Sequence, residues 1–291
     1  MNGTKTENLD TEEGRNISFL TIKTGDKLIT YMKTGKLLID VGNTHTVVGF
    51  YLESAIVSLW RLQSDSERTV DEYWSLLNSL CTSKGYDLKK TSIVALSCVV
   101  PRLTGVFRQL AEKYLNCDFI NVTCELPLGI TYPTPDPSYI GADLIVDAFA
   151  AKEKYKCNCI VCDLGSATTL QLVGADGYFY GTVISPGLVT SADSLIKKAA
   201  QLTGIELSDE MPLLGKNTRE AMLSGILRGH ALMIDGFISQ IREEFSTLNP
   251  IKVVATGGIA KLVSRFTRFI DVVDETLTLD GLNLISELTI L

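Results

Sequence analysis

The chain has 291 residues, of which 45% are hydrophobic and 21% are charged, and its net charge at pH 7 is −7. Such a composition is typical of a globular protein with room for two modest domains. The negative net charge disfavours broad binding of nucleic acids or anionic membranes. The N-terminal residues lack the basic start and apolar core of a signal peptide, and no apolar run approaches the roughly 18 residues of a membrane helix, so we expect a cytoplasmic protein.

Residues 1–34 are polar and weakly patterned, and we expect them to form an N-terminal extension outside the fold. Regular patterning begins at Lys36 and predicts seven elements, in the order strand, strand, strand, helix, strand, helix, strand. Their expected positions are 37–41, 45–52, 55–62, 69–85, 92–100, 104–115 and 118–122. The first three strands are expected to form an antiparallel meander.

The second half repeats this order after a helix at 141–155. The helix expected at 218–248 is long and amphipathic. The other expected strands and helices lie at 159–165, 168–175, 178–187, 191–202, 251–258, 259–266 and 280–288. A repeat of more than about 100 residues is too long for a solenoid. The sequence therefore predicts an α/β protein with two similar domains, 35–140 and 141–291, that face one another.

The chain has seven cysteines, an odd number, which disfavours a disulfide framework. Three of them cluster as CNCIVC at 157–162. Zinc commonly needs four ligands from two separated pairs, and the chain has only two histidines. We therefore interpret the cluster as the start of a buried strand.

One local pattern occurs twice, as LLIDVGNTHTVVGF (37–50) and as IVCDLGSATTLQLV (160–173). In both, a strand, an acid, a glycine and a hydroxyl-rich bend are followed by a second strand. Gly42 and Gly165 allow the backbone to approach a bulky anion. The amides and hydroxyls that follow, at Asn43–Thr44 and at Ser166–Thr169, can then receive phosphate oxygens.

Each turn also carries an acid, Asp40 or Asp163, which would repel a bare phosphate. An acid at each turn is compatible with phosphate binding only if a cation lies between the carboxylate and the phosphates. Mg²⁺ fits this place, because it is commonly bound by phosphates together with one or two carboxylates. A third glycine turn, VVATGGIAKLV (253–263), follows a buried strand. A single acid-glycine turn usually only reverses the chain. The matched pair and the ATGG turn together predict nucleotide binding, and the absence of Walker A and G-x-G-x-x-G sequences disfavours P-loop kinases and Rossmann oxidoreductases.

From Leu37 to Leu288 the chain resembles the type III pantothenate kinases, which belong to the acetate and sugar kinase, Hsp70 and actin superfamily. The motifs that carry the resemblance are IDVGNTHTVVGF, WRLQSDSERTVDEYW, SCVVP, YPTPDPSYIGADL, DLGSATT, GTVISPGL, ATGG and TLTLDGL. The resemblance implies a duplicated ribonuclease H-like (actin-like ATPase) fold with a nucleotide cleft between the domains, and a homodimer. It also implies transfer of the γ-phosphoryl group of ATP to the primary hydroxyl of pantothenate, the first step of coenzyme A synthesis, with Mg²⁺ and a monovalent cation (K⁺ or NH₄⁺).

The same resemblance implies roles for individual residues. Asp143 would be the catalytic base, Asp40 would hold magnesium, and Asp163 would hold the monovalent cation. The residues implied for ATP and phosphate are Asp40, Gly42, Asn43, Thr44, Ser166, Thr168, Gly257 and Gly258. Those implied for pantothenate are Tyr132, Gly141, Ala142, Asp143 and Thr218, the last being Thr218 of the partner subunit. From the residues alone, Asp143 and Asp147 can equally be the polar face of a helix.

The chain departs from the family pattern on the acceptor side. The resemblance predicts an arginine after Asp143, to meet the carboxylate of pantothenate, and the chain has Leu144. Loss of such a pair from a closed pocket costs about 2–5 kcal/mol, roughly 30-fold to several thousand-fold in affinity. In addition, Thr182 stands where a second glycine is usual, and YPTPDP replaces an asparagine-proline turn.

Three functions stay open at this point. The first is a pantothenate kinase in which Arg102 or Arg219 replaces the lost arginine. The second is a kinase for a related acceptor without a carboxylate. The third is a nucleotide-binding paralogue without turnover that has a regulatory role.

Overall fold

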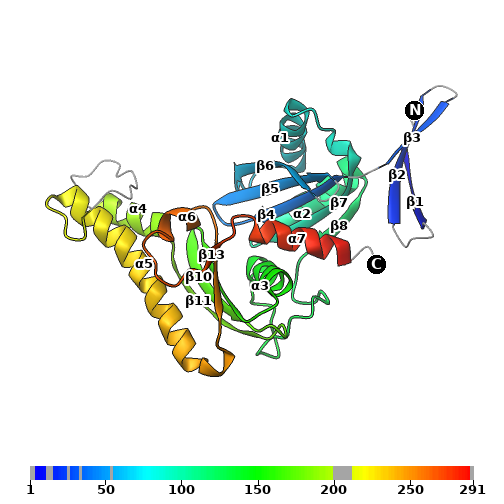
Figure 1. Ribbon diagram of the computed structural model, residues 1–291. Coiled ribbons are helices and arrows are strands. Elements are labelled where there is room, and N and C mark those ends of the chain that lie inside the picture. The colour runs from blue at the N-terminus through cyan, green and yellow to red at the C-terminus, as the bar shows by residue number, and fades with distance from the viewer. Residues whose placement is uncertain are drawn as a thin grey trace. The chain divides into compact units, whose positions relative to one another are not determined.

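The computed structural model describes residues 4–10, 16–24, 27–32, 35–52, 55–198 and 212–288 (Figure 1). The chain forms two compact units that are built from non-contiguous segments. Unit 1 comprises Met1–Leu128, Ser138–Val146 and Thr278–Leu291, and unit 2 comprises Gly129–Pro137 and Asp147–Leu277. The domain boundaries expected from the sequence stay predictions.

Unit 1 is built on a five-stranded sheet with the order β6-β5-β4-β7-β8. Strand β5 is antiparallel to β4 and β6, whereas β7 runs parallel to both β4 and β8. The strands are β4 (Gly35–Val41), β5 (His45–Leu52), β6 (Ala55–Gln63), β7 (Thr91–Cys98) and β8 (Asp118–Asn121). These agree with the predicted strands and with the predicted meander.

Helices cover this sheet and bury its apolar side chains. They are α1 (Val70–Ser83), η1 (Leu88–Lys90), α2 (Pro101–Leu110) and η2 (Ala111–Leu115). Thr69 caps the first helix and forms a capping box with Glu72. Tyr73 of α1 and Phe107 of α2 lie in the same buried cluster as Leu37 and Phe50 of the sheet.

The C-terminal helix α7 (Leu277–Leu288) packs against β4 and β5 of unit 1, although its sequence position places it in the second half of the chain. Lys36 donates to Asn283 at 2.9 Å and to Glu287 at 2.8 Å. A side chain at Gly49 would lie 3.2 Å from Leu279, so the absence of a side chain there admits the helix. This return of the chain was not predicted.

Unit 2 has a second five-stranded sheet, with the order β11-β10-β9-β12-β13. Strands β9 to β11 are antiparallel, and β12 runs parallel to β9 and β13. The strands are β9 (Cys159–Leu164), β10 (Ala167–Val173), β11 (Phe179–Pro186), β12 (Lys252–Thr256) and β13 (Val272–Val273). The strand order and directions are those of the first sheet, so the predicted duplication is confirmed.

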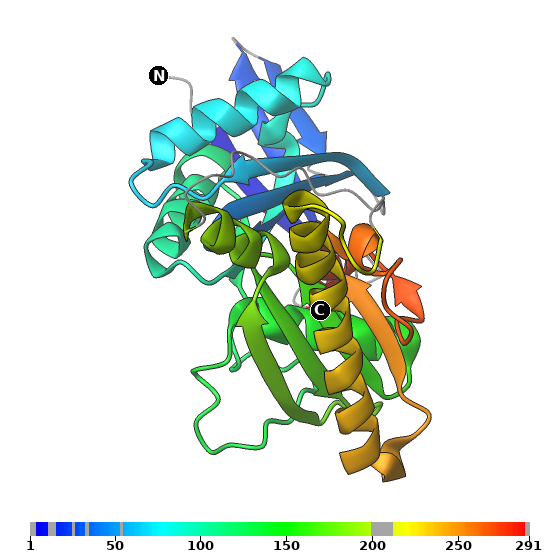
Figure 2. The same cartoon turned by 90° about the vertical axis from the view of Figure 1, so that its left-hand side faces the viewer.

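The helices of unit 2 include α5, which crosses one face of this sheet (Figure 2). Helix α3 belongs to unit 1 in its first turn and to unit 2 from Asp147 onward. The helices are α3 (Ala142–Tyr155), α4 (Leu188–Lys198), α5 (Thr218–Glu244), η3 (Ser246–Leu248) and α6 (Ala260–Val263). The predicted helix at 191–202 begins earlier, at Leu188, and its last residues lie outside the described range.

Helix α5 is long and apolar enough to cross a membrane by length and composition, which the sequence analysis did not predict. Half of its most apolar window is buried inside the protein, and Leu227, Ile234 and Ile238 pack in the core of unit 2. The helix therefore has the pattern of a core helix.

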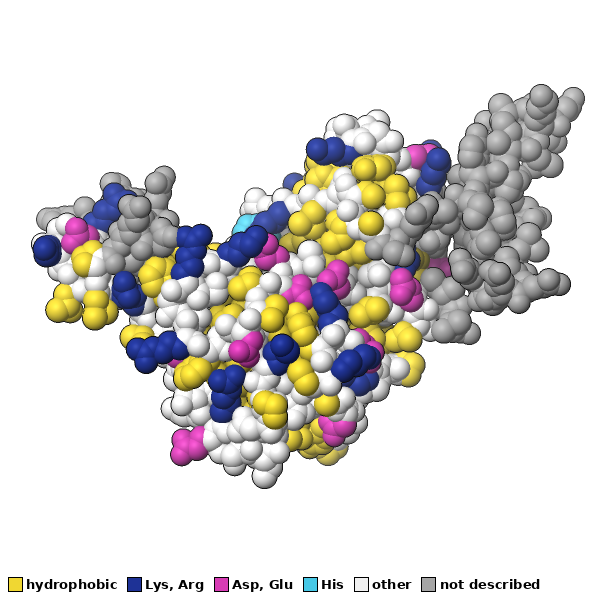
Figure 3. All heavy atoms as spheres, viewed as in Figure 1, with side chains coloured by type: hydrophobic (Ala, Val, Ile, Leu, Met, Phe, Trp, Pro, Cys, Tyr) yellow, Lys and Arg dark blue, Asp and Glu magenta, His cyan; other side chains and the backbone are white. Residues whose placement is uncertain are grey.

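On the face shown in Figure 3, acidic and basic side chains are interspersed with apolar ones.

Residues 1–34 contain three strands that the sequence analysis did not predict. Strands β1 (Thr4–Asp10), β2 (Asn16–Thr24) and β3 (Lys27–Met32) form an antiparallel sheet of their own.

Candidate functional site

The turn between β4 and β5 is tightly closed. The Gly42 amide donates to the His45 carbonyl at 3.0 Å. Ser64, directly after β6, donates its amide to the Thr44 carbonyl at 3.0 Å and its hydroxyl to the Gly42 carbonyl at 2.6 Å. With both carbonyls occupied, the exposed side of the turn presents the Asn43 and Thr44 side chains. The structure therefore shows a closed turn with two exposed polar side chains, and its binding of an anion stays a prediction.

Asp40 lies one residue before the end of β4, opposite Ser97 of β7. The buried Ser97 hydroxyl donates to Asp40 Oδ1 at 2.8 Å, which fixes the orientation of the carboxylate. The Val99 amide continues the strand pairing by donating to the Val41 carbonyl at 3.0 Å. The ends of β4 and β7 are thus held side by side.

Asp143 lies in the first turn of α3, close to this end of the sheet. A side chain at Gly141 would lie 3.6 Å from Val99 Cγ1 and 2.4 Å from Asp143 Oδ1, so only glycine fits between them. The Leu144 amide donates to Asp143 Oδ1 at 2.8 Å. Unit 1 therefore brings Asp40 and Asp143, two predicted site residues, to the same end of one sheet.

Burial raises the pKa of Asp143, and backbone hydrogen bonds from Leu144 and from its own amide oppose that rise. A carboxylate with a raised pKa is a better proton acceptor near neutral pH than an exposed one. Asp143 is half-buried and Asp147 is only 2% exposed, so neither lies on a fully solvated face of the helix. Leu144 is buried as well, with 7% of its surface exposed.

The second turn, between β9 and β10, is closed in a similar way and is one residue shorter than the first. The Gly165 amide donates to the Ala167 carbonyl at 3.0 Å. The Ser166 carbonyl accepts from the Gly187 amide at 3.0 Å and from the Thr190 hydroxyl at 2.7 Å. A side chain at Gly187 would lie 2.3 Å from the Gly165 carbonyl oxygen, so the end of β11 packs directly on this turn. Ser166 itself stays exposed.

The ATGG turn lies directly against Asp163. Register pairs Thr256 of β12 with Asp163 of β9, and Gly257 follows with a φ of +92°, which side chains rarely adopt. A side chain at Gly257 would lie 2.4 Å from Asp163 Oδ1 and 2.7 Å from the Leu164 backbone. Unit 2 therefore brings Asp163, Gly165 and Gly257 together, and their role in nucleotide binding stays a prediction.

Comparisons with known proteins identify the family of this chain. The family model for type III pantothenate kinases matches residues 36–240. The type III pantothenate kinase of Roseiflexus sp. (strain RS-1) is 39% identical over 252 residues, which cover 87% of this chain and 98% of that protein. This chain belongs to the type III pantothenate kinase family. The enzyme of the same name from Syntrophus aciditrophicus (strain SB) is also 39% identical, over 249 residues that cover 86% of this chain and 97% of the relative.

Solved structures confirm the fold of this family member. A putative Baf family transcriptional activator from Campylobacter jejuni superposes with a TM-score of 0.54 at 18% identity, covering 87% of this chain and 98% of the other. MreB 5 of Spiroplasma citri, bound to AMPPNP, superposes with a TM-score of 0.51 at 11% identity, covering 88% and 96%. These likenesses show the actin-like ATPase fold and nothing about the reaction.

Thr168, predicted to contact phosphate, points away from the surface of the second turn. It is fully buried, and its hydroxyl lies 2.9 Å from Nε2 of His230 on α5. Burial lowers the pKa of His230, so this ring is neutral at pH 7. In this arrangement the Thr168 side chain supports the turn from the buried side, and the Ser166 hydroxyl faces solvent. Direct phosphate contact by Thr168 stays a prediction.

The residues predicted to contact pantothenate are divided between the two units. Gly141, Ala142 and Asp143 belong to unit 1, and Tyr132 belongs to unit 2. The Tyr132 ring lies 6.2 Å, between centroids, from Phe179 of β11. The segment that carries it is joined to β11 by a hydrogen bond from the Phe179 amide to the Thr131 carbonyl at 2.8 Å.

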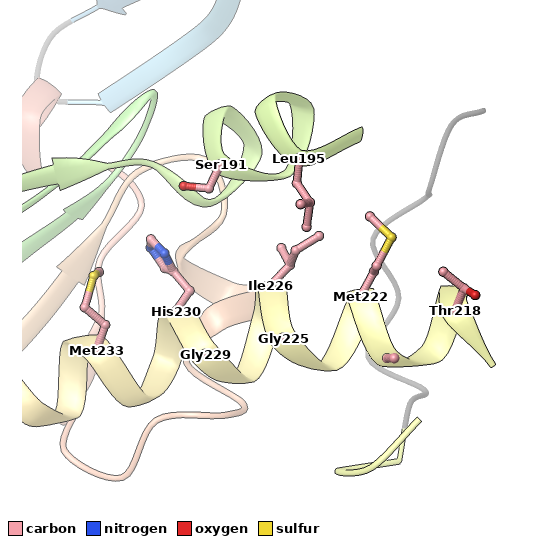
Figure 4. A pocket seen from close by; sticks show the side chains of 10 residues that line it. Ser191, Leu195, Thr218, Met222, Gly225, Ile226, Gly229, His230 and Met233 are labelled. Atoms are coloured by element: carbon pink, nitrogen blue, oxygen red, sulfur yellow. The ribbon is translucent and has the colours of Figure 1, made fainter. Parts of the chain in front are cut away.

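Thr218, at the start of α5, lines a groove of about 530 Å³ between α4 and α5 (Figure 4). Three small residues on the exposed face of α5 form part of this groove, namely Ala221, Gly225 and Gly229. The other side chains are mainly apolar, with His230 pointing toward α4.

Sequence reasoning missed Ser64 and His230, which brace the two turns. The signal for Ser64 is weak, a small hydroxyl residue directly after a predicted strand. His230 lies 62 residues from Thr168, and no local pattern connects them.

Proposed function

We propose that this chain transfers the γ-phosphoryl group of ATP to the primary hydroxyl of pantothenate, the first step of coenzyme A synthesis. The observation that carries the proposal is the 39% identity to a type III pantothenate kinase over 98% of that protein's length. The closed acid-glycine turns and the placement of Asp143 support it.

Asp143 would act as the base in this reaction. Its carboxylate orients the acceptor hydroxyl and takes the proton as the new oxygen–phosphorus bond forms and ADP leaves. Phosphoryl transfer needs little covalent help from a protein, so positioning and relief of phosphate charge supply most of the rate. The turn at Gly42–Thr44 and the turn at Gly165–Ser166 would position the phosphates.

The carboxylates of the two turns fit the cations that the family implies. Mg²⁺ prefers oxygen ligands and is usually held by one or two carboxylates together with phosphates and water. Asp40, held by Ser97, is suited to this role, and Asp163 would hold the monovalent cation. A bound Mg²⁺ would offset the negative charge of the phosphates.

An acceptor series tests the proposal. Purified chain is incubated with ATP, Mg²⁺ and K⁺ and with pantothenate, pantetheine or pantothenol, and phosphorylated products are measured. We expect pantothenate to be phosphorylated. Because Leu144 is buried and uncharged, the alternative is a kinase for acceptors without a carboxylate, and turnover of pantetheine and pantothenol alone would support that alternative. A rise in melting temperature with ATP but no product would support the regulatory paralogue.

Leu144→Arg tests the acceptor side. An arginine here would place a guanidinium next to Asp143, where it can pair with the carboxylate of pantothenate. We expect the KM for pantothenate to fall by about 30-fold or more, while the KM for pantetheine, which has no carboxylate, stays unchanged. Leu144→Met is the control, because it keeps the volume and adds no charge. An equal change in KM for pantothenate and for pantetheine would contradict the assignment of residue 144 to the carboxylate of pantothenate.

The groove on α5 supports the further proposal that the chain is a homodimer. Small residues at Ala221, Gly225 and Gly229 allow another helix to approach closely, and exposed apolar side chains flank them, including Leu195 and Leu232. In a homodimer, Thr218 of the partner subunit would reach the acceptor site, as the family resemblance implies.

Gly225→Leu tests the homodimer. A side chain at Gly225 meets nothing within 4 Å in the protomer, and leucine favours helix over glycine, so the fold is expected to persist. In sedimentation velocity at micromolar concentration, we expect a dimer for the unmodified chain and a monomer for the variant. Ser239→Leu, exposed on α5 outside the groove, is the control. A monomeric unmodified chain, or a variant that stays dimeric, would refute the role of this groove.

A further inference from the structure

Two basic side chains meet beside the first phosphate turn. Arg61 of β6 and His45, the first residue of β5, are both exposed, and Arg61 Nη2 donates to His45 Nδ1 at 3.3 Å. Register pairs Arg61 with Val47 and Gln63 with His45, so the arginine lies across the strand from the turn. The guanidinium is therefore held next to the residues that close the turn.

The partner of Arg61 is unusual for an arginine. Among the described residues, the ion pairs include Arg102 with Glu67 but none that involves Arg61. His45 can accept a hydrogen bond at Nδ1 only when this nitrogen carries no proton. Burial and, to a lesser degree, the Arg61 cation lower the pKa of His45, which keeps the ring neutral at pH 7. The pair thus presents one positive charge, that of Arg61, beside the turn.

The backbone carbonyls of the turn next to this charge are already engaged. Its Gly42 and Thr44 carbonyls already accept from Ser64. The nearby acids have other partners, since Asp65 accepts from the Glu67 amide, Glu67 pairs with Arg102, and Asp40 accepts from the Ser97 hydroxyl. A guanidinium beside the exposed Asn43 and Thr44 side chains has the composition of an anion site, and its planar fork matches phosphate oxygens.

We propose that Arg61 binds a phosphate oxygen of the nucleotide, and that His45 is a positioning residue that orients the guanidinium. The proposal rests on the proposed function in one respect, that the anion received by this turn is a nucleotide phosphate. Within the reaction, Arg61 would offset phosphate charge from the protein side, in addition to any metal ion.

Titration of the purified chain with ATP, ADP and adenosine tests the proposal. For Arg61→Gln we expect ATP and ADP to bind about 10- to 100-fold more weakly, because a charge-assisted hydrogen bond to phosphate is lost. Adenosine has no phosphate, so its affinity should be unchanged. Arg61→Lys should recover part of the ATP affinity. Arg108→Gln, at an exposed arginine of α2 that lies over Phe119, is the matched control and should leave all three affinities unchanged.

His45→Ala isolates the positioning role. We expect a loss of ATP affinity of about 3- to 10-fold, smaller than that of Arg61→Gln, since one neutral hydrogen bond is removed. The loss should largely disappear in the Arg61→Gln background, because His45 then has no guanidinium to orient.

Unchanged ATP affinity in Arg61→Gln would overturn the proposal. So would an equal loss for adenosine with a lowered melting temperature, which would indicate a structural role. The titration needs no turnover. A chain that binds ATP through Arg61 but phosphorylates no acceptor would therefore uphold this proposal while refuting the proposed function.

Discussion

Asp143→Asn is expected to lower kcat for pantothenate phosphorylation by about 100- to 10,000-fold, the range typical for loss of a positioned general base. The asparagine side chain keeps the shape of aspartate, but its amide cannot take the proton from the hydroxyl of pantothenate. Steady-state kinetics measure the loss, and Asp118→Asn, at an exposed acid of β8, is the control. ATP should raise the melting temperature of Asp143→Asn as much as that of the unmodified chain. Retained activity would contradict the assignment of the base.

The raised pKa of Asp143 gives this prediction a second readout in stability. A carboxyl group with a folded-state pKa above its ordinary value binds its proton more tightly when folded. Its contribution to stability therefore falls as pH rises from the ordinary pKa through the raised one, and at pH 7 the ionised form costs stability. Asp143→Asn removes this cost, so its melting temperature at pH 7 should be at least that of the unmodified chain. Activity of the unmodified chain should fall as pH drops through the raised pKa.

Gly257→Ala is expected to damage stability and nucleotide binding together. Its φ of +92° is strained for alanine, and its Cβ would lie 2.4 Å from Asp163 Oδ1. We expect unfolding to be easier by about 1–3 kcal/mol, the usual cost of a forced backbone conformation. We expect ATP affinity to fall at least about 10-fold, because the Asp163 carboxylate must move and a charge-assisted contact of this kind is worth that much.

Gly225→Ala is the matched control for Gly257→Ala. A side chain there has open space, and alanine favours helix over glycine by roughly 1 kcal/mol, so stability should be unchanged or higher. Melting temperature and ATP titration measure both variants. A Gly257→Ala protein that matches the unmodified chain in both would contradict the packing of the ATGG turn against Asp163.

The sequence predicted the two sheets because their signals are local. Buried apolar runs such as 92–100 and the alternation around each acid-glycine turn specify strands without information from distant residues. The chain from Lys36 to Asn121 therefore folds almost as predicted. The duplicated order of elements predicted two similar α/β domains. The family resemblance implied the actin-like ATPase fold, which the structural neighbours confirm.

Contacts over long sequence separations could not be predicted in this way. Helix α7 was recognised as a helix, but its packing on β4 depends on Lys36 and Glu287, which are 251 residues apart. The motif DLGSATT was recognised as well. Ser166 lies in the bend before β10 and Thr168 lies within the strand, and the motif alone could not show that Thr168 faces His230 of α5 while Ser166 stays exposed.

The most direct test of the central claim is transfer of labelled phosphate. Purified chain is mixed with γ-labelled ATP, Mg²⁺, K⁺ and pantothenate, and the label is followed by chromatography and mass spectrometry. The account predicts that the label moves to the primary hydroxyl of pantothenate, with one ADP formed for each phosphorylated product. Label that stays on ATP, under conditions in which ATP demonstrably binds the chain, would contradict the account.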